Sequence, residues 1–239
     1  MTSADTSATT QPTRRTQAAD LAGVIGIAVI VLGMILAAAA YEGSLGQAYS
    51  VANHFVSELG EIGVSRLALA FNAGLVLGGL GIAVFVAGFV SRLEGWFRWV
   101  VGPIGVVTGI FGSLVGVFPM NALAAHFIVA NSFFYLGMVT MILFSVYVLV
   151  SRHRELPRWI AIPGMAAAAA LFAFLFLAGS IEQLVNSQAP TPNLGVNRPD
   201  VWVSALFEWV AVAAVLLWVA TVAVLLLVAG RIRKKTPDP

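Results

Sequence analysis

Six long runs of apolar residues follow one another along the chain, separated by short polar links. They cover Leu21 to Tyr41, Leu67 to Val90, Trp99 to Phe118, Leu123 to Val150, Trp159 to Gly179 and Val203 to Ala229. A helix crosses a hydrocarbon core with about 20 residues at about 1.5 Å each, and every run is long enough to do so. The pattern predicts an all-α polytopic membrane protein, with a bundle of six transmembrane helices over residues 21–230.

The two ends of the chain lie outside these runs. Residues 1–20 are rich in Ser, Thr and Ala without hydrophobic periodicity, which predicts a disordered tail, and residues 231–239 form a short basic tail. Arg14 and Arg15 before the first run leave a cleaved signal peptide as an alternative. The run exceeds the usual signal-peptide core of about 7 to 15 residues, which favours an uncleaved first span.

Composition narrows the possible chemistry. The chain has 239 residues, of which 59% are hydrophobic and 10% charged, and it has no cysteine. Disulfides and thiolate ligands are therefore excluded, and any metal would need histidine or carboxylate ligands. The net charge is +2, but the basic residues lie beside apolar runs, so we read them as orientation signals and expect membrane lipids, not nucleic acid, as partners.

Basic residues are distributed unequally between the alternate sides of the predicted spans. Only Arg66 and Arg198 fall on one side. The other side carries Arg14, Arg15, Arg92, Arg98, Arg152, Arg154, Arg158, Arg231, Arg233, Lys234 and Lys235. By the positive-inside rule both termini are cytoplasmic in a multi-pass protein of the cell membrane. The link between the first two spans is then extracytoplasmic.

Glycines recur at steps of three and four residues in two neighbouring runs. They are Gly74, Gly78 and Gly81 in the second run and Gly102, Gly105, Gly109, Gly112 and Gly116 in the third. Small residues at this spacing let two helix backbones approach closely, so we predict that spans two and three pack through these stripes. A glycine-lined pore is the less common alternative.

The stretch "NHFVSELGEIG" from Asn53 to Gly63 is polar on one face. At 100° per residue Asn53, His54, Ser57, Glu58 and Glu61 fall on one side, and apolar residues fall on the other. This predicts an extracytoplasmic amphipathic helix between spans one and two, lying on the outer leaflet with its polar face in water. The alternative is that this face lines a pocket.

Other polar residues are expected at the same depth. They are Ser57, Asn72, Asn121, His126, Glu182 and Glu208. Ionisable side chains inside a span cost about 2.5 to 3.5 kcal/mol on insertion scales, so His126 and Glu208 should face the bundle interior. We take His54, Glu58 and His126 as candidate catalytic residues, and the other five residues named here as candidate pocket residues.

A divalent metal such as zinc is one possible cofactor of this pocket. His54 and Glu58 are four residues apart, so they share one helical face and with His126 would supply a His/His/Glu ligand set. The spacing is weak evidence because pairs of this kind are common by chance. For His126 a plain hydrogen bond to a neighbouring helix is the alternative.

Three functions stay open. The chain has no glycine-rich phosphate loop and no GxSxG motif, which argues against a nucleotide-driven motor. The favoured hypothesis is lipid handling or a membrane-embedded hydrolase or transferase, in which Glu58 or His126 is the general base. The alternatives are a small-solute transporter or channel, and a non-catalytic structural or partner-binding protein.

Two stretches also resemble a known family. "HFVSELGEIGVSRLALAFNAGLVLGGL" and "GSLVGVFPMNALAAHFIVANSFF" are similar to the bacterial and archaeal membrane proteins called domain of unknown function 998. The resemblance covers about Gly23 to Ala229 and implies a six-span fold without an assigned activity. Its motif positions are His54, Ser57, Glu58, Gly60, Phe71, Asn72, Gly74, Pro119 and His126. Asn121 stands where the family often has an acidic residue.

Overall fold

Six apolar helical spans build the protein, as predicted. The computed structural model describes residues 14–151, 156–185 and 198–235, with side chains as far as Ile232. Five spans are the single helices α1 (Arg14–Ala39), α2 (Ala68–Val90), α3 (Phe97–Val117), α4 (Leu123–Val150) and α7 (Val203–Lys235). The remaining span joins η3 (Arg158–Ile160), α5 (Ala161–Phe172), the π-helical turn η4 (Ala173–Leu177) and α6 (Ala178–Val185). All six are long and apolar enough to cross a membrane.

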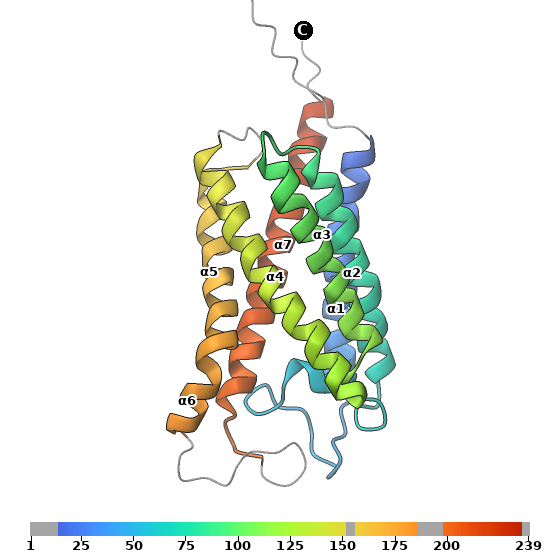
Figure 1. Ribbon diagram of the computed structural model, residues 1–239. Helices are drawn as coiled ribbons and strands as arrows, with labels where there is room; N and C mark the ends of the chain where they lie inside the picture. The colour runs from blue at the N-terminus through green and yellow to red at the C-terminus, as the bar shows by residue number, and fades with distance from the viewer. Residues whose placement is uncertain (1–13, 152–155, 186–197, 236–239) are drawn as a thin grey trace, which may run out of the picture.

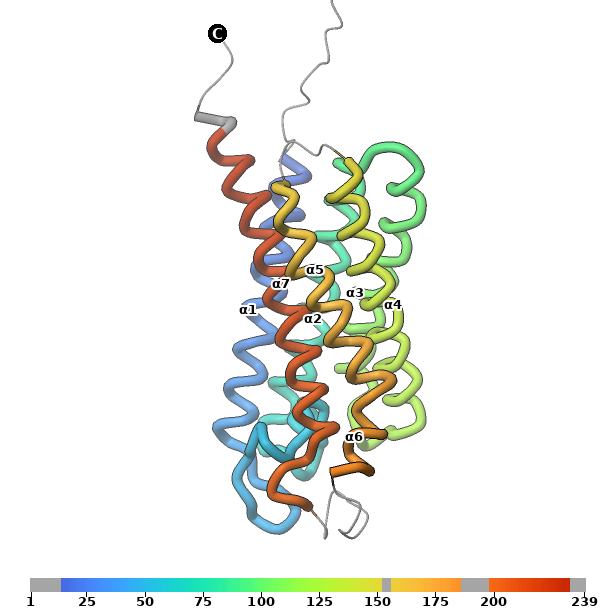
Figure 2. Tube along the Cα trace, turned by 90° about the vertical axis from the view of Figure 1, so that its left-hand side faces the viewer, coloured from blue at the N-terminus to red at the C-terminus, as the bar shows by residue number. Residues whose placement is uncertain are grey.

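The six spans form a closed ring. Each of α1, α2, α3 and α4 packs on the next helix, α5 packs on α7, and α7 returns to α1 (Figures 1 and 2). The start of α1 and the end of α7 share one end of the bundle, which we call the termini end. The segment between α1 and α2, which we call the loop segment (residues 40–67), covers the opposite end, the loop end. A ring of this kind encloses an interior that the inner faces of the spans can line.

The first helix begins earlier than the sequence indicated. Residues 14–20 belong to α1, so the prediction of a disordered tail is wrong for them, and residues 1–13 lie outside the described part of the chain. Asp20 explains the difference. It is fully buried and accepts two hydrogen bonds of 2.8 Å from the Arg92 guanidinium at the end of α2. This bidentate pair ties the polar start of α1 to the bundle.

Glycines bring α2 close to both of its neighbours, but only part of the predicted pairing is present. The stripe of α3 does face α2: a Cβ on Gly109 would lie 2.8 Å from the Ala83 nitrogen. The stripe predicted in α2 faces α1 instead, since a Cβ on Gly74 would lie 3.0 Å from the Val29 carbonyl. Gly79, outside that stripe, is the α2 glycine against α3. Residue spacing showed which positions are small but not which neighbour they meet.

The predicted amphipathic helix on the membrane surface is wrong. The loop segment runs through turns into one short 3₁₀ helix, η1 (Val56–Gly60), and its polar side is turned inward. His54 is 2% exposed and Glu58 1% exposed, whereas Ile62 is 48% exposed. Val56 and Leu59, which lie on the predicted apolar face, are buried as well, and the polar residues meet protein groups from other elements and not water. The reason lies in the partners described next.

Candidate functional site

Glu208 of α7 holds the start of η1. Its Oε2 accepts a hydrogen bond of 2.7 Å from the Val56 N–H. The first N–H groups of a helix lack partners inside the helix, so a carboxylate placed there satisfies them. Glu208 thus caps the start of η1 from another helix, whereas a capping residue usually belongs to the helix that it caps. The prediction that Glu208 faces the bundle interior is confirmed, because its side chain is buried.

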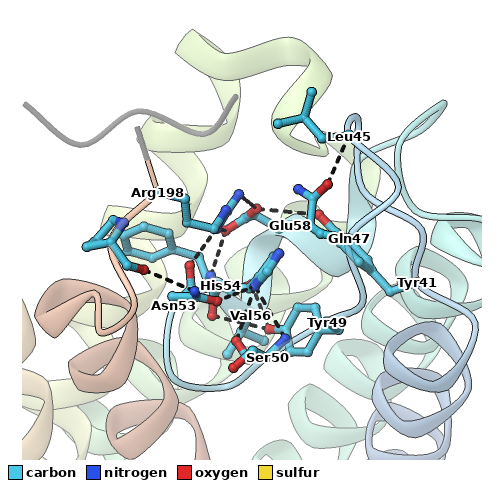
Figure 3. A network of polar contacts seen from close by, with 12 residues as sticks. Tyr41, Leu45, Gln47, Tyr49, Ser50, Asn53, His54, Val56, Glu58 and Arg198 are labelled. Carbon is cyan, nitrogen blue, oxygen red and sulfur yellow. Dashed lines mark hydrogen bonds and ion pairs between the residues drawn. The ribbon is translucent and has the colours of Figure 1, made fainter. Parts of the chain in front are cut away.

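Glu58 is paired with an arginine from the far side of the sequence (Figure 3). Arg198 donates from Nη1 and Nη2 to the two Glu58 oxygens, at 3.1 and 2.7 Å. Glu58 Oε1 also accepts the Phe55 N–H at 2.8 Å, the reach back from the third helical residue that occurs in a capping box. Arg198 continues to the Asn53 carbonyl. The carboxylate is therefore satisfied as an anion, and its burial is compensated by this pairing.

His54 lies among aromatic rings beside this pair. The ring centroids of Tyr41 and Tyr49 are 5.2 and 5.0 Å from that of His54. Asn53 donates from Nδ2 to the Pro199 carbonyl, which turns its Oδ1 toward His54 Nδ1 at 2.8 Å. This contact is shorter than the 3.3 Å between Nδ1 and the Ser50 N–H, so we assign the hydrogen of His54 to Nδ1. Nε2 is then a buried acceptor without a hydrogen-bond partner among the described residues.

Burial dominates the ionisation of this cluster. It lowers the pKa of His54, an effect that the Arg198 charge adds to and the Glu58 charge opposes. Burial also raises the pKa of Tyr41 and of Tyr49 well above their usual range, and the Glu58 charge acts in the same direction. At neutral pH the His54 ring and both tyrosines are therefore uncharged, and the Glu58 and Arg198 charges face each other.

The other predicted pocket residues fix the same segment from different sides. Asn72 of α2 donates to the Gly60 carbonyl at 2.9 Å. Asn121, just before α4, exchanges two hydrogen bonds with the Ile62 backbone at 2.7 and 2.8 Å. Glu182 lies apart from them and accepts the Ser204 N–H at 2.9 Å, at the start of α7. These side chains form hydrogen bonds with backbone groups, and the sequence predicted only the depth at which they lie.

A cavity of about 110 Å³ lies inside the ring, below η1. It is lined by η1 and by α1, α2, α3, α4 and α7, and almost all of the lining is apolar. On α4 the lining runs from His126 to Thr140, which at about 1.5 Å per residue is about 20 Å along the bundle axis. A small volume spread over that length makes the cavity narrow. An engineered apolar cavity of about 150 Å³ is large enough to bind benzene, so this space is not negligible.

The loop end of the cavity is its polar end. Ser57 and Glu208 line it there, together with His126, one turn into α4. His126 is buried, as expected, and its Nδ1 lies 2.8 Å from the Phe118 carbonyl at the end of α3. A carbonyl only accepts, so Nδ1 is the protonated nitrogen. Ser57, His126 and Glu208 are thus the predicted residues that the structure brings to one space.

The comparison with protein families decides where the chain belongs. The model of the family described as "Protein of unknown function (DUF998)" matches residues 24–225. The chain is a member of the DUF998 family. No curated protein and no solved structure matches it.

The DUF998 motif now has a structural meaning in this chain. Its His-x-x-Ser-Glu stretch supplies His54 to the aromatic cluster, Ser57 to the cavity and Glu58 to the arginine pair, because His54 precedes η1 and only Ser57 and Glu58 lie in it. The motif asparagine Asn72 and the motif glycine Gly60 are in direct contact. The motif therefore encodes the closure of the loop end over the cavity.

The predicted three-ligand metal site does not form in this DUF998 protein. In residues 14–151, 156–185 and 198–232 no three His, Asp or Glu side chains gather closely enough to hold a metal ion. His126 lies against Phe118 and the cavity, whereas Glu58 is engaged by Arg198. Residues at i and i+4 share one face only in an α-helix, and between His54 and Glu58 the chain has a turn and a 3₁₀ helix instead.

Sequence reasoning missed several residues of the site. Arg198 was counted only as a charge for orientation, and its pairing across 140 residues has no local signal. Tyr41, Tyr49 and Trp209 were not singled out; Trp209 donates to the Tyr49 hydroxyl at 3.1 Å. One signal in the sequence could have indicated them. Glu208 is a carboxyl group one to two turns inside a span, and such a group needs polar partners at the same depth.

Proposed function

We propose that this protein binds a membrane lipid inside its helix ring, with one alkyl chain in the cavity and the polar group of the lipid at the loop end. The observation that carries the proposal is the shape and polarity of the cavity. It is narrow, about 20 Å long and apolar along its depth, and its two ionisable lining residues, His126 and Glu208, lie together at one end. That is the division of polarity along a single-chain amphiphile.

The same lining disfavours a polar solute. An alkyl chain that moves from the bilayer into the cavity exchanges one apolar environment for another, so it loses no hydration. A polar solute would lose its hydration there, at about 2 to 7 kcal/mol for each group left without a hydrogen bond. Lipid handling is therefore favoured over transport of small polar solutes.

Binding is a firmer proposal than hydrolysis or group transfer. A general base must reach the proton that it removes. Both oxygens of Glu58 are engaged by Arg198, while Nδ1 of His126 is engaged by the Phe118 carbonyl. Nε2 of His126 is the remaining candidate for proton transfer, and a binding role uses the same atom as an acceptor. The charge asymmetry of the links favours an extracytoplasmic loop end, so we expect the lipid to come from the outer leaflet.

The test is native mass spectrometry of the protein in nanodiscs with an equimolar mixture of hexadecanol, hexadecylamine, hexadecanoic acid and hexadecyl phosphate. Ala130 lines the cavity one turn below His126 on the same face of α4, so Ala130→Phe should fill the chain path. We expect wild type to retain one hexadecyl compound per protein and Ala130→Phe to lose more than tenfold of the total.

The matched control makes the same change on the same helix outside the cavity. Ala124 is exposed at the start of α4, and Ala124→Phe should bind as wild type does. Val212→Phe fills the cavity from α7 and replaces Ala130→Phe if that variant does not fold. Equal total binding by wild type and a folded cavity-filling variant would contradict the proposal.

A further inference from the structure

We infer that the head group held at the loop end is a hydrogen-bond donor, a hydroxyl or an ammonium group, and not a carboxylate or a phosphate. This inference rests on the proposed function, since it concerns the polar end of the same cavity. It follows from the chemistry of the three polar groups that line this end, Ser57, His126 and Glu208. His126 and Glu208 present acceptors to the cavity, and the Ser57 hydroxyl can accept as well as donate.

His126 presents an unprotonated nitrogen. Its Nδ1 donates to the Phe118 carbonyl at 2.8 Å, and a neutral imidazole has a single N–H. Nε2 is therefore a lone-pair acceptor, fixed in direction by the hydrogen bond on the other side of the ring. An anionic head group offers only acceptors, so it would meet this nitrogen without a proton between them.

Ser57 and Glu208 add to this preference. The Ser57 hydroxyl can accept a hydrogen bond as well as donate one. Glu208 accepts the N–H of Val56 at 2.7 Å. A carboxylate or phosphate placed here would bring a second acid group against Glu208 in an apolar site, where a buried charge without a compensating partner is costly.

The nearest donors already bind acceptors of the protein. The Val56 N–H binds Glu208, and the Arg198 guanidinium binds both Glu58 oxygens and the Asn53 carbonyl. The lining residues, all of them in the described part of the chain, include no lysine or arginine. A hydroxyl or an ammonium group, in contrast, donates to His126 Nε2 and gains from the neighbouring carboxylate.

The same mass-spectrometric mixture tests this inference through the identity of the bound compound. The four compounds share one chain and differ only in the head group, so total binding reports the proposed function and the distribution reports the inference. We expect hexadecanol and hexadecylamine together to exceed hexadecanoic acid and hexadecyl phosphate by about tenfold, the effect of one hydrogen bond made or left unmade. The ratio of alcohol to amine then distinguishes the two donors.

Variants of His126 make the readout specific. His126→Phe removes the acceptor and should lower alcohol and amine binding about tenfold, whereas His126→Gln keeps an acceptor oxygen and should stay within about threefold of wild type. Preferred binding of the acid or the phosphate, blocked by Ala130→Phe, would overturn the inference and leave the proposed function standing. Binding that Ala130→Phe does not affect would overturn both.

Discussion

Two buried carboxylate–guanidinium pairs lie at opposite ends of the bundle and have different neighbours. Asp20 and Arg92 join the adjacent helices α1 and α2 at the termini end, with side-chain exposures of 0% and 9%. Glu58 and Arg198 join two links between spans at the loop end, with exposures of 1% and 12%. Geometry and burial are almost the same, so any difference in their roles must come from what surrounds them.

The surroundings separate a structural pair from one coupled to the cavity. Asp20 and Arg92 connect two helices that already pack along their whole length. Glu58 and Arg198, in contrast, do not lie on two helices that pack against each other. Val56 and Ser57, which precede Glu58, line the cavity, and the Val56 N–H binds Glu208. The comparison teaches that equal ion pairs need not have equal functional consequences. Breaking either should lower stability, and breaking the loop-end pair should also change binding.

The largest effect is expected from removing one arginine at a time. Arg92→Leu and Arg198→Leu each leave a buried carboxylate without its partner, which typically costs about 3 to 5 kcal/mol. Thermal unfolding in detergent should show a similar loss for both variants. Hexadecanol binding to the folded fraction should fall for Arg198→Leu and stay near wild type for Arg92→Leu. Equal binding by the two variants would remove the distinction between the pairs.

A smaller effect is expected from adding one methyl group near each pair. A Cβ on Gly60 would clash with Asn72 Oδ1, and a Cβ on Gly88 would clash with the Ala19 Cβ. Gly60→Ala and Gly88→Ala should each cost about 1 to 3 kcal/mol through overpacking. Only Gly60→Ala should weaken hexadecanol binding, because Gly60 ends η1. Weakened binding in Gly88→Ala would show instead that the cavity senses packing at either end.

The smallest effect is expected from a change in pH, which alters the charge of His54 at the loop end without adding bulk to the side chain. Burial lowers the pKa of His54 below its ordinary 6.5, so the folded state binds fewer protons than the unfolded state as the pH falls. The stability contribution of neutral His54 is complete above about pH 6.5 and is lost progressively below it. Thermal unfolding at pH 7.5 and about pH 5.5 should therefore show a larger decrease for wild type than for His54→Gln.

Other groups titrate in the same pH range, and the comparison of wild type with His54→Gln cancels their contribution to stability. Burial raises the pKa of Glu61, so this residue gives the opposite pH dependence at lower pH. Glu61 is unchanged in His54→Gln, so the difference between the two proteins reports His54. An identical decrease in both would mean that His54 does not become protonated in the unfolding transition.

Much of the architecture could be predicted because it depends on the bilayer. Apolar runs such as Leu67 to Val90 match α2 (Ala68–Val90) within one residue, since length and polarity of a span are set by the hydrocarbon core. Boundaries failed where a long-range partner intervened. The helix that begins at Arg14 passes through Asp20, whose charge is compensated by Arg92 at a separation of 72 residues.

The candidate site could be predicted in residue type and depth but not in arrangement. His126 and Glu208 were expected to face the interior and do line one cavity, because an ionisable group inside a span is too costly to face lipid. His54 and Glu58 were expected to form a water-facing surface and are buried instead. A period of 3.6 residues reports which residues share a side only where the chain is an α-helix, and it carries no information on what meets that side.

The sequence by itself determined the class of the protein: six spans, the polar residues at one end and membership in the DUF998 family. These properties depend on local composition and length, which the bilayer converts directly into structure. Only the tertiary structure decided that Arg198 meets Glu58, that Glu208 caps η1 and that the ring encloses a narrow apolar cavity. Such contacts depend on how distant segments pack, and that is settled only when the six helices close into a ring.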